Sequence, residues 1–476
     1  MASPGALRVP RPTVGLAAPV VMVGALGVGA LVAWQPLLAL GACVALVVAA
    51  AVWARPVIAG YTVVGLTPLI AGVSRGDVIP VLRPSEAVAL LVGGTLAVRG
   101  VARWGAGPRW RPSRVDLAIV AMAVCGSVVP LMWMALRGVD VSRDDILHAF
   151  VLWKYLGVYA LVRASVRTDR QVRRCLWISV AAAGAVAVVA VLQALDMFGV
   201  PGLLVRFYAP LGDTANLDTR IAQGSSTLGL PAATADLLIF NLALARGLWV
   251  REPRRRQRAA LAAVAGVLAL GALSAGEFSS AIGLLIGVVC TAVVTGAPGL
   301  LFLMLPGVGV AYPVLRPVIA KRLEGFQSAS GLPESWIGRL NNLRTYFWPE
   351  LFSRWNFVLG VRPSARVPVA SQITGYVWIE SGYTWLLWGG GIPLLASFVY
   401  FGQVVLTRAW RVARDSAEAR GAAATGVFVA MVVIVALMAF DPHLTYRGSA
   451  DAFFALLALA GLHRAAGDRT ELRGTR

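Results

Sequence analysis

The chain alternates long apolar runs with short polar breaks over most of its length. The runs are roughly 20 residues long, which is the length that a helix needs to cross about 30 Å of hydrocarbon. Because a backbone in lipid must satisfy its own hydrogen bonds, each run is expected to be an α-helix. The pattern predicts twelve to fourteen spans, the fuller count being 15–34, 36–54, 57–73, 84–100, 115–136, 146–164, 175–198, 226–248, 259–275, 278–296, 299–317, 380–406, 422–440 and 448–464.

One long polar stretch, residues 317–379, interrupts this pattern between the eleventh and twelfth spans. Within it, Leu340, Leu343, Phe347 and Leu351 recur at helical spacing, which predicts an amphipathic helix on or near the membrane surface. The predicted fold is therefore an all-α polytopic membrane protein with one large periplasmic or extracellular loop. Its predicted parts are an N-terminal tail (1–14), a transmembrane bundle (15–316) with an outer loop (199–225), the large loop (317–379), C-terminal spans (380–464) and a tail (465–476).

Composition supports the membrane assignment and narrows the function. The chain is 58% hydrophobic and only 14% charged, whereas soluble domains are about 25% charged. The net charge of +20 lies largely in short loops between spans, so we predict membrane lipids and no nucleic acid as partners. Four unpaired cysteines and three scattered histidines predict neither a disulfide framework nor a metal site. No P-loop or Rossmann fingerprint is present, and we predict no cofactor.

The arginines predict the orientation of the spans. With the N-terminus inside, most arginine clusters fall in loops on the inner side, as the positive-inside rule requires. Arg8 and Arg11 precede an apolar stretch that is too long for a signal peptide, so we expect an uncleaved first span. Both termini are then cytoplasmic, and 199–225, 317–379 and 441–447 face outward in a bacterial cytoplasmic membrane.

Two outer segments carry arginines suited to an anion. Arg220 precedes a Gly/Ser/Thr-rich turn that leads to Pro231, and a guanidinium beside a helix start can hold an anion; a plain re-entrant turn is the alternative. The large loop adds substrate-binding candidates, namely Arg339, Arg344, Arg362 and Trp348. Ordinary surface or headgroup contacts remain open for each of these arginines.

The third outer element is Glu380 with Tyr383, at the mouth of a tryptophan-rich span. A carboxylate at membrane depth is costly and is a functional candidate by default, here as a general base or as a counter-ion for an arginine. His443 and Arg447 occupy the last outer turn, which is either a wall of the site or a structural turn.

Two charges lie near the middle of predicted spans, Lys154 and Asp236. Buried charges need partners. We expect these two to pair with each other, either structurally or as a proton relay.

At these residues the chain resembles the O-antigen ligase and O-antigen polymerase family of polytopic membrane glycosyltransferases (GT-C-like). The resemblance covers roughly Arg220 to the C-terminus and rests on Arg220 with its turn to Pro231, on Arg339 with Trp348 to Gly360, and on the stretch from Glu380 to Gly391. Glu380 stands where a ligase has histidine, and Arg362 stands where the family turn has its second glycine. These departures favour a polymerase-like or divergent member.

The resemblance implies transfer or polymerisation of a glycan from a polyprenyl-diphosphate-linked donor at the outer face, without a metal. A glycan or lipid would be the acceptor. Arg220 and Arg339 would then stabilise the diphosphate leaving group, with Arg344 and Arg362 in support, and Glu380 would be the base. The alternatives are a lipid-linked oligosaccharide flippase and a non-catalytic assembly protein. The sugar and linkage are not predictable from the sequence.

Overall fold

The computed structural model describes residues 36–75, 82–103, 112–208, 223–302, 304–324, 333–369 and 375–462. The chain divides into two compact units, residues 1–55 and 56–476. The first unit contributes α2 (Pro36–Ala54), an apolar helix. The predicted first span, 15–34, lies outside the described residues.

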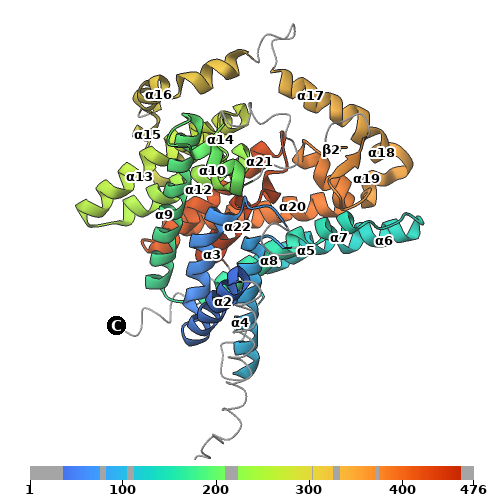
Figure 1. Cartoon of the computed structure of the whole chain (residues 1–476), viewed down its shortest axis with the longest axis horizontal. Helices are drawn as coiled ribbons and strands as arrows, with labels where there is room; N and C mark the ends of the chain where they lie inside the picture. The colour runs from blue at the N-terminus through green and yellow to red at the C-terminus, as the bar shows by residue number, and fades with distance from the viewer. Residues whose placement is uncertain are drawn as a thin grey trace, which may run out of the picture. The chain divides into compact units, whose positions relative to one another are not determined.

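The second unit is almost entirely helical (Figure 1). Its first half contains α3 (Val57–Ile70), α4 (Pro84–Ala102), α5 (Arg114–Cys125), α6 (Val128–Leu136), α7 (Arg143–Ala149), α8 (Val151–Ser165), α9 (Asp169–Ala194) and α10 (Val200–Phe207). Its second half contains α12 (Pro231–Arg251), α13 (Arg255–Ser274), α14 (Phe278–Thr295), α15 (Gly299–Phe302), α16 (Met304–Glu324), α17 (Glu334–Asn342), α18 (Trp348–Phe352), α19 (Asn356–Leu359), α20 (Gly382–Asp415), α21 (Ala419–Leu437) and α22 (Ser449–Leu459).

The helices match the apolar pattern of the sequence. Among the described residues, nine helical stretches are long and apolar enough to cross a membrane, and α5 with α6 and α7 with α8 each count as one stretch. The predicted all-α membrane architecture is confirmed at this level, while the higher count of twelve to fourteen spans stays a prediction. Serine and threonine caps set several helix starts; Thr168, for example, accepts a hydrogen bond from the Gln171 amide at the start of α9.

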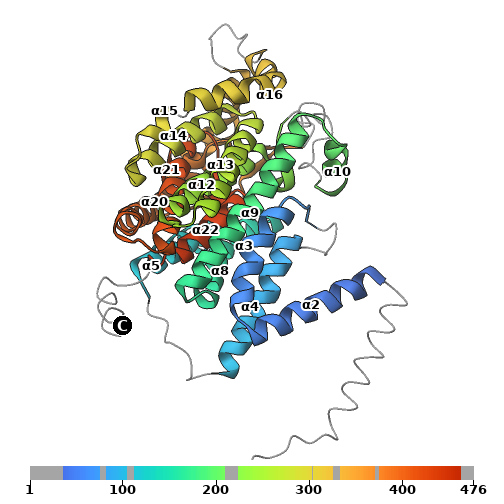
Figure 2. The same ribbon diagram turned by 90° about the vertical axis from the view of Figure 1, so that its left-hand side faces the viewer.

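Helix α12 is the centre of the packing, because it contacts α9, α13, α14, α21 and α22. Figure 2 shows α3 and α9 side by side along the flank of this core. Small residues allow the close approaches. A Cβ on Gly287 would lie 2.6 Å from Ile239, and one on Gly271 would lie 2.7 Å from Ala187. Such small-residue contacts are the usual means of helix association in lipid.

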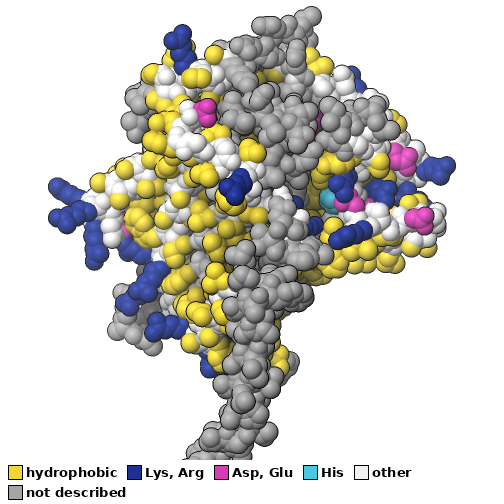
Figure 3. Space-filling view, in the orientation of Figure 1, with side chains coloured by type: hydrophobic (Ala, Val, Ile, Leu, Met, Phe, Trp, Pro, Cys, Tyr) yellow, Lys and Arg dark blue, Asp and Glu magenta, His cyan; other side chains and the backbone are white. Residues whose placement is uncertain are grey.

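The two ends of this unit differ in chemistry. At one end, Gly72 donates to the Thr227 carbonyl (2.8 Å) and Gly382 donates to the Met438 carbonyl (2.8 Å). The first contact ties the loop at 71–75 to the loop at 223–230, and the second ties the start of α20 to the loop at 438–448. We call the end formed by these loops the loop face. At the other end Arg251 donates to the carbonyls of Ser416 and Ala413. We call that end the arginine face; arginine side chains gather at the left-hand edge of Figure 3, beside the start of α13.

The large loop contains a helical stretch over the loop face. Helix α17 continues through a π-helical turn (Leu343–Phe347) into α18. We call this continuous stretch, residues 334–352, the loop helix. Leu343, Phe347 and Leu351 are buried, whereas Leu340 is exposed. A short antiparallel hairpin, β1 (Arg366–Pro368) with β2 (Tyr376–Trp378), then leads the chain back to α20.

Candidate functional site

A cluster of acidic side chains surrounds one arginine at the loop face. Nη1 of Arg339 lies 2.5 Å from a carboxylate oxygen of Asp441, and its Nε lies 3.8 Å from Glu380. Asn342, one turn further along the loop helix, donates to Glu380 at 3.1 Å. Glu277, between α13 and α14, also interacts electrostatically with Arg339. We call Glu277, Arg339, Glu380 and Asp441 the acidic cluster; three carboxylates here face one guanidinium.

Burial separates the roles of the two nearest carboxylates. The Glu380 side chain is 30% exposed, whereas that of Asp441 is only 10% exposed. Burial raises the pKa of Asp441 to about 6, although Arg339 opposes that shift. The pKa of Arg339 is in turn raised, since the attraction of Asp441, Glu277 and Glu380 outweighs its burial. A small molecule can therefore reach Glu380, while Asp441 holds Arg339 in place.

Local backbone packing brings Glu380 to this point. Glu380 precedes the Ser381 cap of α20, whose hydroxyl accepts a hydrogen bond from the Thr384 amide. The next residue, Gly382, packs so closely on α21 that a Cβ there would lie 2.3 Å from the Met438 sulfur. The start of α20 is thus fixed against the end of α21, which places Glu380 near Asp441.

A buried carboxylate–imidazole pair lies behind the acidic cluster. Nδ1 of His443 lies 2.7 Å from Asp236, and both side chains are 1% exposed. Asp236 and Asp441 hold the pKa of His443 above its usual value against the effect of burial. The His443 ring also contacts Tyr446, with ring centroids 4.9 Å apart. This pair fixes the turn 441–447, because it anchors that turn to α12 in the core.

The expected pairing of Lys154 with Asp236 is wrong. Lys154 instead lies 3.2 Å from Asp451 on α22. Asp236 has His443 as its partner. Both charges do have partners, as burial in a membrane bundle demands, but each partner comes from the turn 441–447 or from α22, which follows it.

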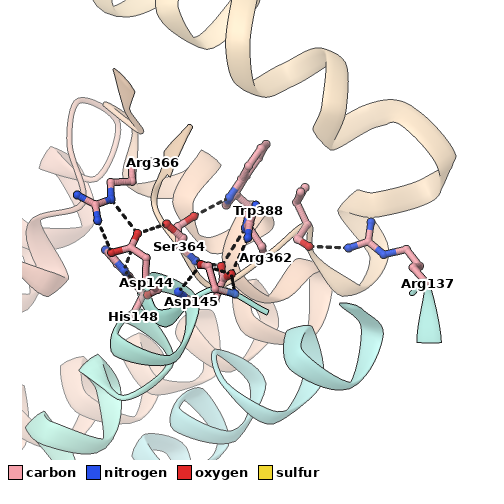
Figure 4. A network of polar contacts seen from close by, with 10 residues as sticks. Arg137, Asp144, Asp145, His148, Arg362, Ser364, Arg366 and Trp388 are labelled. Carbon is pink, nitrogen blue, oxygen red and sulfur yellow. Dashed lines mark hydrogen bonds and ion pairs between the residues drawn. The ribbon is translucent and has the colours of Figure 1, made fainter. Parts of the chain in front are cut away.

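A second polar network ties the large loop to α7 (Figure 4). Arg362 donates to both oxygens of Asp145, at 2.9 and 2.6 Å, and Arg366 does the same to Asp144, at 2.8 and 2.6 Å. The Trp388 indole adds a bond to the Ser364 carbonyl at 2.9 Å. These bidentate pairs raise the pKa of Arg362. Arg362, a predicted substrate-binding residue, is held here in a structural ion pair.

The remaining predicted site residues are dispersed. Arg220 lies outside the described residues. Arg344 is exposed on the loop helix. The Trp348 indole donates to the Thr384 hydroxyl at 3.3 Å, and the Tyr383 hydroxyl donates to the Val435 carbonyl at 2.7 Å. The structure therefore brings Arg339 together with Glu380, whereas the polar groups of Trp348 and Tyr383 form hydrogen bonds within the protein.

The Gly/Ser/Thr-rich turn after Arg220 is buried in the bundle. Ser226 donates from its hydroxyl to the Val186 carbonyl and from its amide to Gln193, at 2.8 and 2.7 Å. The Thr227 hydroxyl donates to the Pro68 carbonyl at 2.8 Å. These donors are already used inside the protein, which favours the re-entrant turn over an anion cradle for this segment.

The glycine run that contributed to the resemblance is a packing feature. Gly391 breaks α20 with a φ of +66°, and a Cβ there would lie 2.3 Å from the Val358 carbonyl oxygen. A Cβ on Gly390 would lie 2.3 Å from the Cys125 carbonyl oxygen. Both sites require glycine because two backbones approach each other closely.

A cluster that the sequence did not single out lies on the far side of the turn 441–447. Arg75 pairs with Glu86 (2.9 Å), and Lys154 pairs with Asp451 (3.2 Å). Arg83 and Arg447 lie among these groups, and each interacts electrostatically with Glu86. We call Arg75, Arg83, Lys154 and Arg447 the cationic cluster. The sequence carried one signal for it, namely two arginines, Arg75 and Arg83, at the two ends of one short connection between apolar runs.

A groove of about 770 Å³ lies at the arginine face and contains none of the predicted site residues. Arginines of α9 and of the α12–α13 connection line it, together with Trp177 and Glu252. Among the described residues, no group of three or more His, Cys, Asp or Glu side chains is placed to hold a metal ion.

Comparisons of the chain with known protein families, with curated proteins and with solved structures find no match.

Proposed function

We propose that this chain is a membrane glycosyltransferase that transfers or polymerises a glycan from a polyprenyl-diphosphate-linked donor. The observation that carries the proposal is the meeting of Arg339 and Glu380, 3.8 Å apart, at the face covered by the loop helix. They come from segments 41 positions apart in the chain, and both belong to the motifs that resemble the O-antigen ligase and polymerase family.

Glu380 acts as the general base in this proposal. It is the more exposed of the two carboxylates that pair with Arg339, and Asn342 orients it through a 3.1 Å hydrogen bond. An acceptor hydroxyl gives its proton to Glu380 while its oxygen attacks the anomeric carbon of the donor. The bond from that carbon to the diphosphate breaks, and the lipid diphosphate leaves with the electron pair.

Arg339 orients this base and stabilises negative charge near it. The three carboxylates around Arg339 already neutralise it, so the acidic cluster is suited to the acceptor side of the reaction. The diphosphate of the donor needs a cationic surface elsewhere on the same face.

The distribution of arginine supports an outward orientation of the loop face. The opposite end holds the arginines of the α8–α9 and α12–α13 connections and those at the end of α20 and the start of α21. Cytoplasmic loops are enriched in arginine and lysine, so the arginine face would be cytoplasmic. Polyprenyl-diphosphate donors presented at the outer leaflet would then meet the acidic cluster.

The test compares two arginines of the loop helix. Cells that lack this gene should accumulate a lipid-linked glycan, and mass analysis of their lipid extract identifies it. The wild-type gene and Arg344→Gln, an exposed neighbour in the same helix, should remove the accumulated glycan, whereas Arg339→Gln should not. Clearance by Arg339→Gln at wild-type expression would refute the site, and the absence of any accumulated glycan would refute the function.

A further inference from the structure

In the part of the chain that the structure describes, the cationic cluster carries more positive charge than its carboxylates neutralise. Four described cations, Arg75, Arg83, Lys154 and Arg447, face two described carboxylates, Glu86 and Asp451. A surplus of two positive charges in a partly buried cluster is costly unless an anion is bound.

Both carboxylates already take part in other hydrogen bonds and ion pairs. Glu86 accepts the Arg83 amide at 3.1 Å at the start of α4, and it binds Arg75 through both oxygens at 2.9 and 3.1 Å. Asp451 accepts the Gly448 amide at 2.9 Å at the start of α22, and it also binds Lys154. Glu86 thus caps a helix, binds Arg75 and lies 4.0 Å from Nη1 of Arg83, while Asp451 caps a helix and binds Lys154. Among the described residues, no carboxylate forms an ion pair with Arg447.

Arg447 is the centre of the surplus. It is only 7% exposed, and within the described part of the chain its Nε and Nη2 have no hydrogen-bond partner. Nε of Arg83 is likewise buried and unpartnered among the described residues. Burial, together with repulsion by Arg83, lowers the pKa of Arg447 to about 10. Two neighbouring guanidinium groups with unused donors are arranged as in a site for phosphate oxygens.

Three helix N-termini add to the positive potential. Arg83 precedes α4, and Arg447 precedes α22. Nη2 of Arg447 lies 3.2 Å from the position that a Cβ on Gly229 would occupy, just before α12. The N-terminal end of a helix carries a partial positive charge and favours anions. Gly229 also leaves the space that the Arg447 side chain needs.

The cluster is open on one side and close to the acidic cluster. The side chains of Arg75 and Lys154 are 32% and 26% exposed, so a ligand can reach them. The turn from Asp441 to Arg447 joins the two clusters, and six residues span at most about 20 Å. The two clusters therefore lie within about 20 Å of each other, and a donor bound at the cationic cluster would lie near the acidic cluster.

We infer that Arg83 and Arg447, supported by Arg75 and Lys154, bind the diphosphate group of the lipid-linked donor. This inference rests on the proposed glycosyltransferase function. It assigns the donor to the cationic cluster and leaves Arg339 and Glu380 to the acceptor.

The test measures binding to the full chain in nanodiscs, with polyprenyl diphosphate, polyprenyl monophosphate and phosphatidylglycerol as separate probes. Arg447→Gln and Arg83→Gln should each weaken polyprenyl diphosphate binding by roughly tenfold to a hundredfold, as expected for lost hydrogen bonds between charged groups. Arg414→Gln, which removes the same charge from an exposed site at the arginine face, should leave binding unchanged.

A second measurement separates ligand binding from a structural role. The ligand-free Arg447→Gln variant should melt at the same temperature as the wild type or higher, because a buried cation without a carboxylate partner is removed. Unchanged diphosphate affinity in both variants, or equally tight phosphatidylglycerol binding by the wild type, would overturn the assignment. Glycan transfer that persists with unchanged affinity in the variants would refute this site alone. A wild type that neither binds diphosphate nor transfers glycan would refute the proposed function as well.

Discussion

Asp441 should make the protein less stable as the pH rises, and Asp441→Asn should remove that dependence. The carboxylate is 10% exposed and lies 2.5 Å from Arg339. Its pKa is raised from 3.8 to about 6 because burial outweighs the attraction of Arg339. The folded state therefore binds a proton more tightly than the unfolded state does, so stability is lost as the pH rises from about 4 to about 6.

The size of the effect follows from the shift. About two pKa units at 1.36 kcal/mol each correspond to about 3 kcal/mol. Most of this, about 2.5 kcal/mol, should appear between pH 4 and pH 7 as a fall in the free energy of unfolding of the wild type relative to Asp441→Asn. The difference between the two proteins is the quantity to follow, because other carboxylates titrate equally in both.

The assay is equilibrium unfolding in detergent with sodium dodecyl sulfate at several pH values. Asp140→Asn is the control, since it removes the same charge from an exposed position between α6 and α7 and should change stability by less than about 0.5 kcal/mol. A wild-type-minus-Asp441→Asn difference that stays flat, or in which the wild type gains stability as the pH rises, would refute the reasoning about burial.

Two further predictions concern the contacts that hold the large loop to α7 and to α20. Arg362→Gln and Asp145→Asn should be non-additive, with a coupling energy of about 1.5–3 kcal/mol in a double-mutant cycle of unfolding free energies, because Arg362 donates to both oxygens of a fully buried carboxylate; additive effects would show that the pair does not hold the loop to α7. Gly391→Ala should lower stability by more than about 2 kcal/mol, since it adds a Cβ at a φ of +66° and 2.3 Å from a carbonyl oxygen, whereas Gly94→Ala, which meets nothing within 4 Å, should not destabilise; equal melting temperatures for these two variants would contradict the close approach.

The positions of the helices were predictable because the bilayer constrains span length more strongly than side-chain packing does. Each predicted span from residue 36 onward contains a helix. The loop helix was predictable too, since Leu343, Phe347 and Leu351 follow helical spacing and are buried together. The spacing of apolar residues shows which face of a helix is buried, and it can be read from neighbouring positions in the sequence alone.

The partners of the buried charges were not predictable from the sequence. Asp236 pairs with a residue 207 positions away, and Lys154 pairs with one 297 positions away. A charged side chain in a predicted span indicates that a partner is needed. Only the packing of α12 and α22 determines which residue that partner is. Arg362 shows the same limit, because its spacing in the loop gave no sign of Asp145 on α7.

The cationic cluster did leave a trace in the sequence. Arg75 and Arg83 flank the short connection between the predicted spans 57–73 and 84–100. With the N-terminus predicted inside, this connection would lie outside, where the positive-inside rule disfavours arginine. Their meeting with Arg447 depends on the contacts of α3 with α4 and with α22, which no local pattern encodes.

Glycan transfer by purified protein tests the central claim most directly. Wild-type protein and Glu380→Gln, reconstituted in proteoliposomes, are given the lipid-linked glycan that accumulates in cells lacking the gene, and released polyprenyl diphosphate is measured over time. Removing a general base should slow transfer by about 10²–10⁴-fold, while binding of polyprenyl diphosphate stays at the wild-type level. Transfer by Glu380→Gln at the wild-type rate would contradict the assignment of Glu380 as the base, and no release by the wild type would contradict the glycosyltransferase itself.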